Sequence, residues 1–506
     1  MANLLLGIDI GTQGTKAALF TARGRCLARA FEPSQLHKPQ PGVVEEDPDR
    51  QVASVCRTIR QCMASARADA SGVAGIGIDG QMAGVIGVGK DARAVTPYDS
   101  WLDTRCGPYI RVMERRAGRR IMAKTGGPPS FNHGPKKLWW MHERKKVYRQ
   151  IAAFVQPGGY AVMRLCGLSA DRAFIDTTYL HFSGFADNCR RRWDQSLCRT
   201  FGLDASKLPR IVAPHAVMGE LTARAASACG LRSGVPVVAG CGDTAASFLS
   251  CGATAEGISV DVAGTASVFA ATTAAFRVDH DNRMLACGQS AVPGLWHPYA
   301  YINGGGMNLE WFRREIANRG RSAGRALLSF DQLNAQAARL VPRDDLPLFV
   351  PHLGGRVCPS QSELRGAWTN LTWSHTAAHL YRSVLEAVAL EYALYKSVLG
   401  SLYENLPLGE LRVTGGGEKS ALWNRLKADA LQIPVRRIAR CEGATAGAAM
   451  VAGFGVGVLK DLPSAANQWI RLGRTTLPDA AQAGHYARRL ARYRRLLNVL
   501  DNGGDV

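Results

Sequence analysis

The strongest constraint on the fold is a short pattern that occurs twice: an apolar strand, an aspartate, small residues and a hydroxyl. The first copy reads GIDIGTQGTK at residues 7–16, and the second reads DVAGTAS at residues 261–267. A third glycine loop, residues 415–417, follows the apolar run 411–414. Glycine lets the backbone come close to an anion, so that N–H groups can surround phosphate oxygens. The repeated loop predicts a duplicated fold that holds a nucleotide between two lobes.

The length of the chain favours two domains over one. It has 506 residues, and single hydrophobic cores stop growing at about 250–300 residues. We place the boundary within residues 245–257 and expect domains at 1–250 and 251–506. Hydrophobic residues make up 46% and charged residues 20%, which is typical of a soluble globular protein. Since no apolar run reaches the ~18 residues of a membrane helix, we expect no membrane association.

The N-terminal residues and the cysteines predict a cytoplasmic protein. Residues 1–3 carry no basic side chain and lead directly into the first strand, which argues against a signal peptide. Thirteen cysteines are scattered between Cys26 and Cys441 and form no Cys-x-x-Cys pair. An odd number without metal-site spacing favours reduced thiols over a disulfide framework or a zinc site.

The charge balance raises the question of nucleic acid, because Lys and Arg exceed Asp and Glu by 21. The basic residues gather at 115–120, 144–146, 190–192 and 488–495. Residues 486–497 also carry apolar side chains at helical spacing, which predicts an amphipathic terminal helix. We therefore interpret these groups as solvated helix faces and loops, and we expect no nucleic acid partner. A positive field would also attract an anionic nucleotide.

The apolar pattern and its breaks predict alternating strands and helices. We expect strands at residues 4–9, 16–21, 73–78, 85–88, 151–155, 235–240 and 411–414, and a hairpin at 261–272. We expect helices at residues 50–64, 136–146, 308–319, 376–401, 420–431 and 443–453, and a break at 156–159. The first glycine loop joins two strands, so it is a phosphate-binding hairpin and not a Walker loop or a Rossmann turn.

Asp9 ends the first strand beside this hairpin. A hard carboxylate there would hold Mg²⁺, directly or through water. The loop N–H groups near Gly14 and the hydroxyls of Thr12 and Thr15 would contact phosphate oxygens, and Lys16 is a candidate cation for developing charge. A glycine-rich hairpin with only a structural role is the alternative.

Asp243 stands between Gly242 and a helix that begins with Thr244. A helix N-terminus stabilises the ionised carboxylate, and the neighbouring glycine leaves room for a substrate. Such a carboxylate could take the proton of a hydroxyl during phosphoryl transfer. A plain helix N-cap is the alternative role for this aspartate.

Further glycines supply the other nucleotide contacts. Gly264 and Thr265 offer N–H groups and a hydroxyl to the β- and γ-phosphates, and the loop at 415–417 lets an adenosine or α-phosphate lie against the backbone. The alternative for that loop is a strand-to-helix turn, which needs only one of the three glycines. The turn NGGG at residues 303–306 precedes the helix expected at 308–319.

The segment 79–105 carries groups that suit a polyol. Gln81 and Met82 follow a strand end, and Trp101 and Asp103 lie in one short loop. Polyol recognition uses an aromatic wall with bidentate hydrogen-bonding groups. A surface loop with a partly buried tryptophan is the alternative.

These motifs resemble those of the FGGY carbohydrate kinases, most closely the xylulokinase-like branch, almost from end to end. The resemblance rests on residues 7–16, 45–48, 77–82, 101–105, 137–141, 240–246, 264–265, 366–371 with 379–386, and 415–420. It implies two actin-like (ribonuclease-H-like) α/β domains with ATP in the cleft between them. It also implies closure of the lobes, which would exclude water and limit futile ATP hydrolysis.

The resemblance also implies roles for individual residues. The family's catalytic aspartate falls on Asp243. By analogy with glycerol kinase, a set of residues falls on nucleotide-contacting positions: Thr12, Gln13, Lys16, Thr265, Gly306, Glu310, Gly416 and Ser420. Gly14, Thr15, Gly264 and Gly417 belong to the same motifs.

The chain departs from the family pattern at several positions. Ala83 stands where xylulokinases usually carry a histidine, so one direct sugar contact is missing or supplied elsewhere. Asn370 replaces a glycine of the second family signature, and Asn132, Gly134 and Arg144 depart from the edges of the first. The phosphate loops and the catalytic aspartate are intact, so we expect an active enzyme.

We therefore predict an ATP-dependent kinase that phosphorylates a hydroxyl of a ketose or polyol, with Asp243 as the base and Asp9 organising Mg²⁺. A non-enzymatic, nucleotide-gated sugar sensor of the same fold is the alternative, although a sensor could dispense with both carboxylates. Salt-sensitive DNA binding without sugar-stimulated ATP consumption would favour a nucleic-acid-binding protein instead. The sequence does not determine the sugar, the hydroxyl or the oligomeric state, for which a homodimer is one option.

Overall fold

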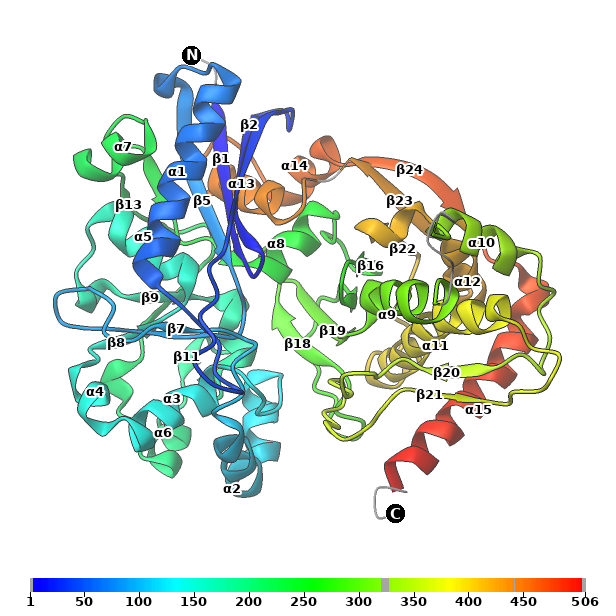
Figure 1. Ribbon diagram of the computed structural model, residues 1–506. Helices are drawn as coiled ribbons and strands as arrows, with labels where there is room; N and C mark the ends of the chain where they lie inside the picture. The colour runs from blue at the N-terminus through cyan, green and yellow to red at the C-terminus, as the bar shows by residue number, and fades with distance from the viewer. Residues whose placement is uncertain (1–2, 320–326, 441, 503–506) are drawn as a thin grey trace.

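Two lobes, each built around a mixed β-sheet, lie side by side in this computed structural model, which describes residues 3–319, 327–440 and 442–502. Figure 1 shows the N-terminal lobe in blue to green and the C-terminal lobe in green to red. The two-lobed α/β fold that the repeated hairpin predicts is confirmed. Within the described ranges, no helix is both long and apolar enough to cross a membrane.

The two sheets share one plan. The first runs through β13 (Val217–Glu220), β14 (Pro236–Val238), β5 (Val73–Gly80), β1 (Leu4–Gly11), β2 (Gly14–Thr21) and β3 (Cys26–Pro33), with β15 (Cys241–Gly242) beside β5. The second runs through β18 (Ala286–Gln289), β19 (Trp296–Ile302), β17 (Ser267–Ala271), β16 (Ile258–Ala263), β22 (Glu410–Thr414), β23 (Val435–Arg440) and β24 (Arg471–Thr476). In both, an antiparallel glycine hairpin has a parallel strand beside its first arm.

Helices and short strand pairs complete each lobe. The N-terminal lobe has α1 (Pro48–Ala66), α2 (Gly107–Thr125), α3 (His133–Glu143), α4 (Lys145–Gln150), α5 (Pro157–Cys166), α6 (Gln195–Phe201), α7 (Ala223–Cys229) and α8 (Asp243–Ser250). The second half of the chain has α9 (Gly305–Phe312), α10 (Phe330–Ala338), α11 (Ala377–Leu402), α12 (Ala421–Leu431) and α15 (Ala483–Asn502) in the C-terminal lobe, and α13 (Ala444–Gly455) and α14 (Leu462–Trp469), which pack against the first sheet. The short pairs are β4 (Glu45–Glu46) with β7 (Tyr98–Asp99), β6 (Ile86–Val88) with β8 (Ala153–Val155), β9 (Phe174–Asp176) with β12 (Arg210–Val212), β10 (Ala186–Asp187) with β11 (Arg192–Trp193), and β20 (Leu348–Val350) with β21 (Ala367–Thr369).

The helix α13 joins the two parts of the chain. It comes late in the sequence, yet it packs on β1 and β5 of the first sheet, beside α8 (Figure 1). Two glycines make this contact possible: a Cβ atom at Gly7 or Gly77 would lie 1.8 or 2.1 Å from a backbone oxygen of α13. The predicted close-packed helix at 443–453 is confirmed, and it ties the first sheet to the C-terminal lobe.

Most expected elements are found within a few residues of their expected bounds, with two exceptions. The break expected at 156–159 is wrong, because α5 begins at Pro157. Proline at the first helical position loses no intrahelical hydrogen bond, so the pair Pro-Gly starts this helix instead of ending a strand. The helix expected at 136–146 is divided at Arg144, whose backbone is not helical.

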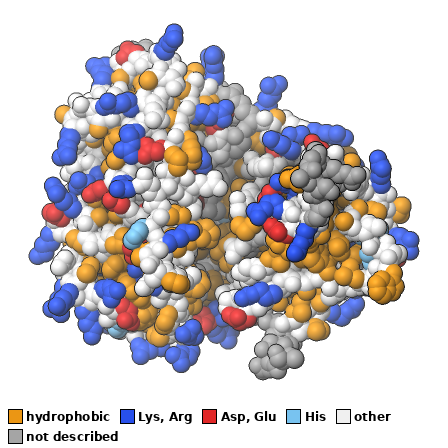
Figure 2. All heavy atoms as spheres, in the orientation of Figure 1, with side chains coloured by type: hydrophobic (Ala, Val, Ile, Leu, Met, Phe, Trp, Pro, Cys, Tyr) orange, Lys and Arg blue, Asp and Glu red, His pale blue; other side chains and the backbone are white. Residues whose placement is uncertain are grey.

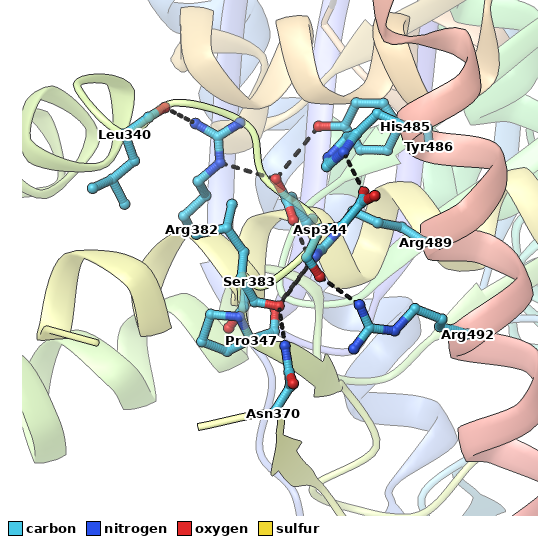
Figure 3. Close-up of polar contacts among 12 residues, drawn as sticks. Leu340, Asp344, Pro347, Asn370, Arg382, Ser383, His485, Tyr486, Arg489 and Arg492 are labelled. Carbon is cyan, nitrogen blue, oxygen red and sulfur yellow. Dashed lines mark hydrogen bonds and ion pairs between the residues drawn. The ribbon is translucent and has the colours of Figure 1, made fainter. Parts of the chain in front are cut away.

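The terminal helix α15 is held by a buried charge network (Figure 3). Arg489 is only 1% exposed, and its guanidinium lies 2.7 Å from the carboxylate of Glu386 on α11. It also donates hydrogen bonds to the carbonyls of Leu346 and Pro347. The predicted amphipathic terminal helix is therefore confirmed, and its inner face combines apolar packing with this charged anchor.

Replacing Arg489 tests the anchor. Arg489→Met should lower the free energy of unfolding by about 3 kcal/mol, because Glu386 keeps only Arg382 as a buried counter-charge and the carbonyls of Leu346 and Pro347 lose their donor. Urea unfolding would measure this loss. The neighbouring Arg488, whose side chain is 62% exposed beside Asp344, is the matched control, and Arg488→Met should cost less than about 1 kcal/mol. Equal losses in both variants would contradict the assignment.

Candidate active site

Three carboxylates meet at the carboxyl ends of neighbouring strands in the first sheet. β1 and β5 are parallel and in register, so that Asp9 and Asp79 are Cα partners. Cys241 of β15 pairs with Asp79 from the other side, and Asp243 follows two residues later as the first residue of α8. The Tyr179 hydroxyl donates hydrogen bonds to the carbonyls of Gly80 and Cys241 and so joins the two strand ends. The backbone therefore brings together aspartates that lie 70 or more residues apart.

The pKa of Asp243 is raised to about 7, first by burial and then by the nearby Asp9 carboxylate. Hydrogen bonds from Thr244 oppose the rise, and the Thr244 hydroxyl donates to Asp243 Oδ1 at 3.1 Å. A carboxyl group with a pKa near neutrality can both accept and release a proton under physiological conditions. The arrangement therefore suits proton transfer better than a simple capping role.

Lys16 and Asp79 flank Asp9 on its two sides. The Lys16 ammonium lies 3.0 Å from Asp9 Oδ2, and burial lowers its pKa less than Asp9, Asp79 and Asp243 together raise it. Burial raises the pKa of Asp79 well above its usual range, and the contacts with Asp9 and Asp243 add to that rise. A single cation thus faces three carboxylates in this corner.

A chain of hydrogen bonds links the hairpin tip to the predicted acceptor wall. The Trp101 indole donates to the Thr12 hydroxyl at 2.8 Å, and that hydroxyl donates to Gln81 Oε1 at 3.3 Å. Gln81 in turn donates to Glu46 at 3.1 Å. Three residues predicted from separate motifs are therefore brought together, and a fourth, Met82, has its sulfur against Gly242, next to the Asp243 helix.

A cavity of about 500 Å³ opens in the C-terminal lobe beside the second hairpin. Five residues predicted to contact a nucleotide line it: Gly264, Gly306, Gly416, Gly417 and Ser420. Ser420 also caps α12, where its hydroxyl accepts the Trp423 N–H. A cavity of this volume with apolar walls and a few polar groups is typical of a small-molecule site.

The first turn of α9 lies directly on the second hairpin. Gly306 N donates to the carbonyl of Gly264, and Met307 N donates to the carbonyl of Thr265. A Cβ atom at Gly306 would lie 2.5 Å from the Gly264 oxygen, so glycine is required there. The helix expected at 308–319 begins earlier, at Gly305, because these contacts extend it toward the hairpin.

Three predicted side chains are directed elsewhere. The Thr15 hydroxyl is bonded to Ser54 of α1, since alternate residues of a strand face opposite sides. Asp103 accepts hydrogen bonds from Val44 N and from Arg105, so its carboxylate is committed to the loop. Glu310 is paired with Arg313 on its own helix and does not line the cavity. Gln13 lies at the exposed hairpin tip, where its carbonyl accepts the Ser34 N–H.

Sequence reasoning missed several residues of the site. Asp79 could have been found, since it is a strand-end aspartate like Asp9. His133, which contacts the Met82 carbonyl at 2.7 Å, and the cavity residue Asn334 carry no local signal. Their positions depend on packing between segments that are distant in the sequence.

The corner around Asp9 fits a divalent cation. Asp9 Oδ1 is buried without a hydrogen-bond partner, and carboxylate oxygens are preferred ligands of Mg²⁺. Across the part of the chain that the structure describes, no group of three or more His, Cys, Asp or Glu side chains could hold a metal alone. Mg²⁺ is commonly bound by one or two carboxylates together with substrate phosphates, so the corner suits a cation that arrives with a nucleotide.

Comparisons with known proteins cover both lobes. The N-terminal domain model of the FGGY family of carbohydrate kinases matches residues 4–250, and the C-terminal domain model matches residues 260–456. The xylulose kinase of Escherichia coli (strain K12) is 26% identical, over 98% of this chain and 99% of that protein. The gluconokinase of Bacillus subtilis (strain 168) is 25% identical, over 86% of this chain and 84% of that protein.

Solved structures of carbohydrate kinases also match this chain over nearly its whole length. The xylulose kinase from Rhodospirillum rubrum is 27% identical, with a TM-score of 0.88 over 98% of this chain and 99% of that chain. The gluconate kinase from Lactobacillus acidophilus has a TM-score of 0.91 over 99% of both chains, at 22% identity, and shows the fold alone.

The raised pKa of Asp243 predicts how stability depends on pH. Its protonated form is favoured in the folded state, so that contribution is complete below pH 3.8 and is lost as pH rises through about 7. Asp243→Asn, which keeps the hydrogen bond from Thr244, should therefore raise the unfolding free energy by about 4 kcal/mol at pH 8 and by less than half of that at pH 5.

Urea unfolding of the ligand-free protein at both pH values would measure the effect. Asp187→Asn is the control, because Lys124 lies 2.8 Å from Asp187 and the pKa of that carboxyl is lowered. This variant should lose stability at pH 8. A loss in Asp243→Asn of similar size would contradict the pKa assignment.

Proposed function

The chain belongs to the FGGY family of carbohydrate kinases and phosphorylates a sugar with ATP, and on this premise we propose that Asp243 is the general base of the reaction. Its carboxylate accepts the proton of the acceptor hydroxyl while the hydroxyl oxygen attacks the γ-phosphorus of ATP. The bond between that phosphorus and the β–γ bridging oxygen breaks, and ADP leaves. The observation that carries the proposal is the position of Asp243, at the N-terminus of α8 beside Asp9 and Lys16 of the first hairpin, with a pKa of about 7.

We propose that the two lobes divide the work at a boundary near residue 250. Residues 1–250 supply the base and the acceptor wall of Gln81, Met82 and Trp101. Residues 251–506 supply the nucleoside cavity, with Gly416, Gly417 and Ser420 along one wall. The two glycine hairpins hold the phosphates through N–H groups and through Thr12, Lys16 and Thr265.

Magnesium enters this proposal as the cation of the nucleotide. Asp9 would hold it, directly or through water, while the bound cation neutralises phosphate charge in the reaction. The residues of this chain position the phosphates. Asp9 would hold the cation against the phosphate oxygens, and Lys16, whose ammonium lies 3.0 Å from Asp9, would offset negative charge on the phosphates. The unpartnered Oδ1 of Asp9 supports the assignment.

We propose that the acceptor is a neutral ketose or polyol and not an aldonate, although both xylulose kinases and gluconokinases are among the relatives. The corner beside Asp243 is acidic. Three cations near this corner are bound to protein acceptors: Lys16 to Asp9, Lys136 to two carbonyls and Arg105 to carboxylates. A substrate carboxylate would therefore have to give up water without gaining any of these three cations as a free partner.

We further propose a cytoplasmic enzyme that acts without nucleic acid. On the face seen in Figure 2, the surface is hollowed between the lobes, and Lys and Arg side chains are spread over both lobes with no single basic stripe. A nucleic acid site usually gathers such residues on one face. Sedimentation of the full chain would decide between a monomer and the homodimer that the sequence allows.

Removing the base tests the mechanism. Asp243→Asn should lower kcat by about 10²–10⁴-fold, since general base catalysis contributes a factor of that size. ADP affinity, measured by calorimetry, should stay within about threefold, because the nucleoside cavity is untouched. Asp176→Asn is the control: Asp176 also has a pKa raised to about 7, but it is more deeply buried and caps a turn through Thr178. Substantial kinase activity in Asp243→Asn would refute the base assignment.

The charge of the acceptor is tested with a matched substrate pair. D-Gluconate and D-glucitol differ only in the charged end, so the comparison isolates the carboxylate. Among ketoses, polyols and gluconate assayed by ADP release, the best neutral acceptor should exceed gluconate by at least about 100-fold in kcat/KM, the equivalent of an unpaired buried charge. A preference for gluconate over every neutral acceptor would overturn the proposal of a neutral substrate, and it would leave the proposed role of Asp243 as general base unchanged.

A further inference from the structure

Asp79 is a buried carboxyl group that the proposed reaction leaves unused. Its side chain is 0% exposed, and neither carboxylate oxygen has a hydrogen-bond partner among the described residues. Asp9, its partner on the adjacent strand, is 6% exposed and also has one unpartnered oxygen. Burying a carboxylate without a partner is costly, so two such groups side by side indicate a ligand that supplies positive charge.

The second sheet provides an internal comparison, because β16 and β22 repeat the arrangement of β1 and β5. Asp261 stands in β16 two residues before the strand ends at the turn, as the first aspartate does in β1. Its carboxylate is paired with the buried Lys427 and accepts a hydrogen bond from the Tyr392 hydroxyl. Opposite it in β22 stands Val413. The C-terminal lobe thus neutralises its single carboxylate, whereas the N-terminal lobe has two and satisfies neither fully.

We propose that Asp79 is a second carboxylate of the divalent-cation site, so that Asp79 and Asp9 together form the protein's part of that site. The assignment rests on the proposed function, in which the cation arrives with ATP. Asp79 contributes directly or through water, and phosphate oxygens complete the ligand set.

The charges at this corner favour a divalent cation over other ligands. Lys16 supplies one positive charge, and it lies against Asp9 Oδ2, while Asp9 Oδ1 and both Asp79 oxygens have no hydrogen-bond donor among the described residues. A hard divalent ion takes oxygen ligands, and one or two carboxylates with phosphates is its usual environment at nucleotide sites. The absence of a third protein ligand within the described ranges agrees with a site that the nucleotide completes.

Two other roles for Asp79 make different predictions. As a neutral acid that shares a proton with Asp9, it would only orient that carboxylate, and an amide in its place would serve almost as well. As an acceptor for a sugar hydroxyl, it would affect the sugar KM and leave the affinity for the metal unchanged. A cation ligand alone requires the negative charge for metal binding.

The test measures Mn²⁺ binding to the full chain in the presence of ADP, by electron paramagnetic resonance of free Mn²⁺. In Asp79→Asn the Mn²⁺ dissociation constant should rise at least about tenfold, because even outer groups of metal sites contribute 10–100-fold. Asp9→Asn should show a loss of similar size. Asp176→Asn, which removes a buried carboxyl outside the site, should bind Mn²⁺ within about twofold of the unaltered chain.

Each other outcome has a definite meaning. Unchanged Mn²⁺ affinity in Asp79→Asn, with a loss in Asp9→Asn, overturns the inference and leaves the proposed function standing. A changed sugar KM with unchanged metal affinity also overturns it and assigns Asp79 to the acceptor. If the unaltered chain with ADP binds no Mn²⁺, the metal part of the proposed function itself fails. The melting temperature of the ligand-free Asp79→Asn should not fall, and a clear fall would assign Asp79 to the structure.

Discussion

The in-register parallel pairing of β1 with β5 is the constraint on which the site depends. It places Asp9 beside Asp79 and, through β15, brings Asp243 to the same corner. Burial raises the pKa of Asp243 to about 7, and the Asp9 carboxylate that the strand register brings close adds to that rise. A shift of one residue would turn these side chains to the opposite face of the sheet and abolish the site.

The surrounding packing keeps these three carboxyl groups close together, although their mutual repulsion and burial are unfavourable. Glycines at 7 and 77 let the backbone of α13 lie against β1 and β5, so a helix from the end of the chain covers the strands that carry the aspartates. The same helix lies beside α8, whose first residue is Asp243. A helix from the C-terminal half of the chain is therefore packed directly beside the helix that begins with Asp243.

The sequence predicted the elements of the fold well, because each depends on local pattern. Hairpin glycines, strand-end aspartates and capped helices are visible in a window of about ten residues. The directions of individual side chains were less predictable. Thr15 faces Ser54 because side chains alternate between the two faces of a strand. Asp103 is bonded to Arg105 of its own loop, so its carboxylate is not available to a ligand. Asp79 was not predicted as a site residue, because its neighbour in the sheet, Asp9, lies 70 positions earlier in the chain.

The sequence by itself determined that the chain forms two α/β lobes with anion-binding hairpins and a candidate base at the start of a helix, because glycine spacing and apolar periodicity act locally. Only the tertiary structure decided which aspartates share a corner and which are neutralised. Asp9 and Asp79 stand side by side without full compensation, whereas Asp261 is paired with Lys427. The physical reason is that the state of a carboxylate depends on what lies within a few ångströms of it, and strand pairing between distant segments sets those neighbours.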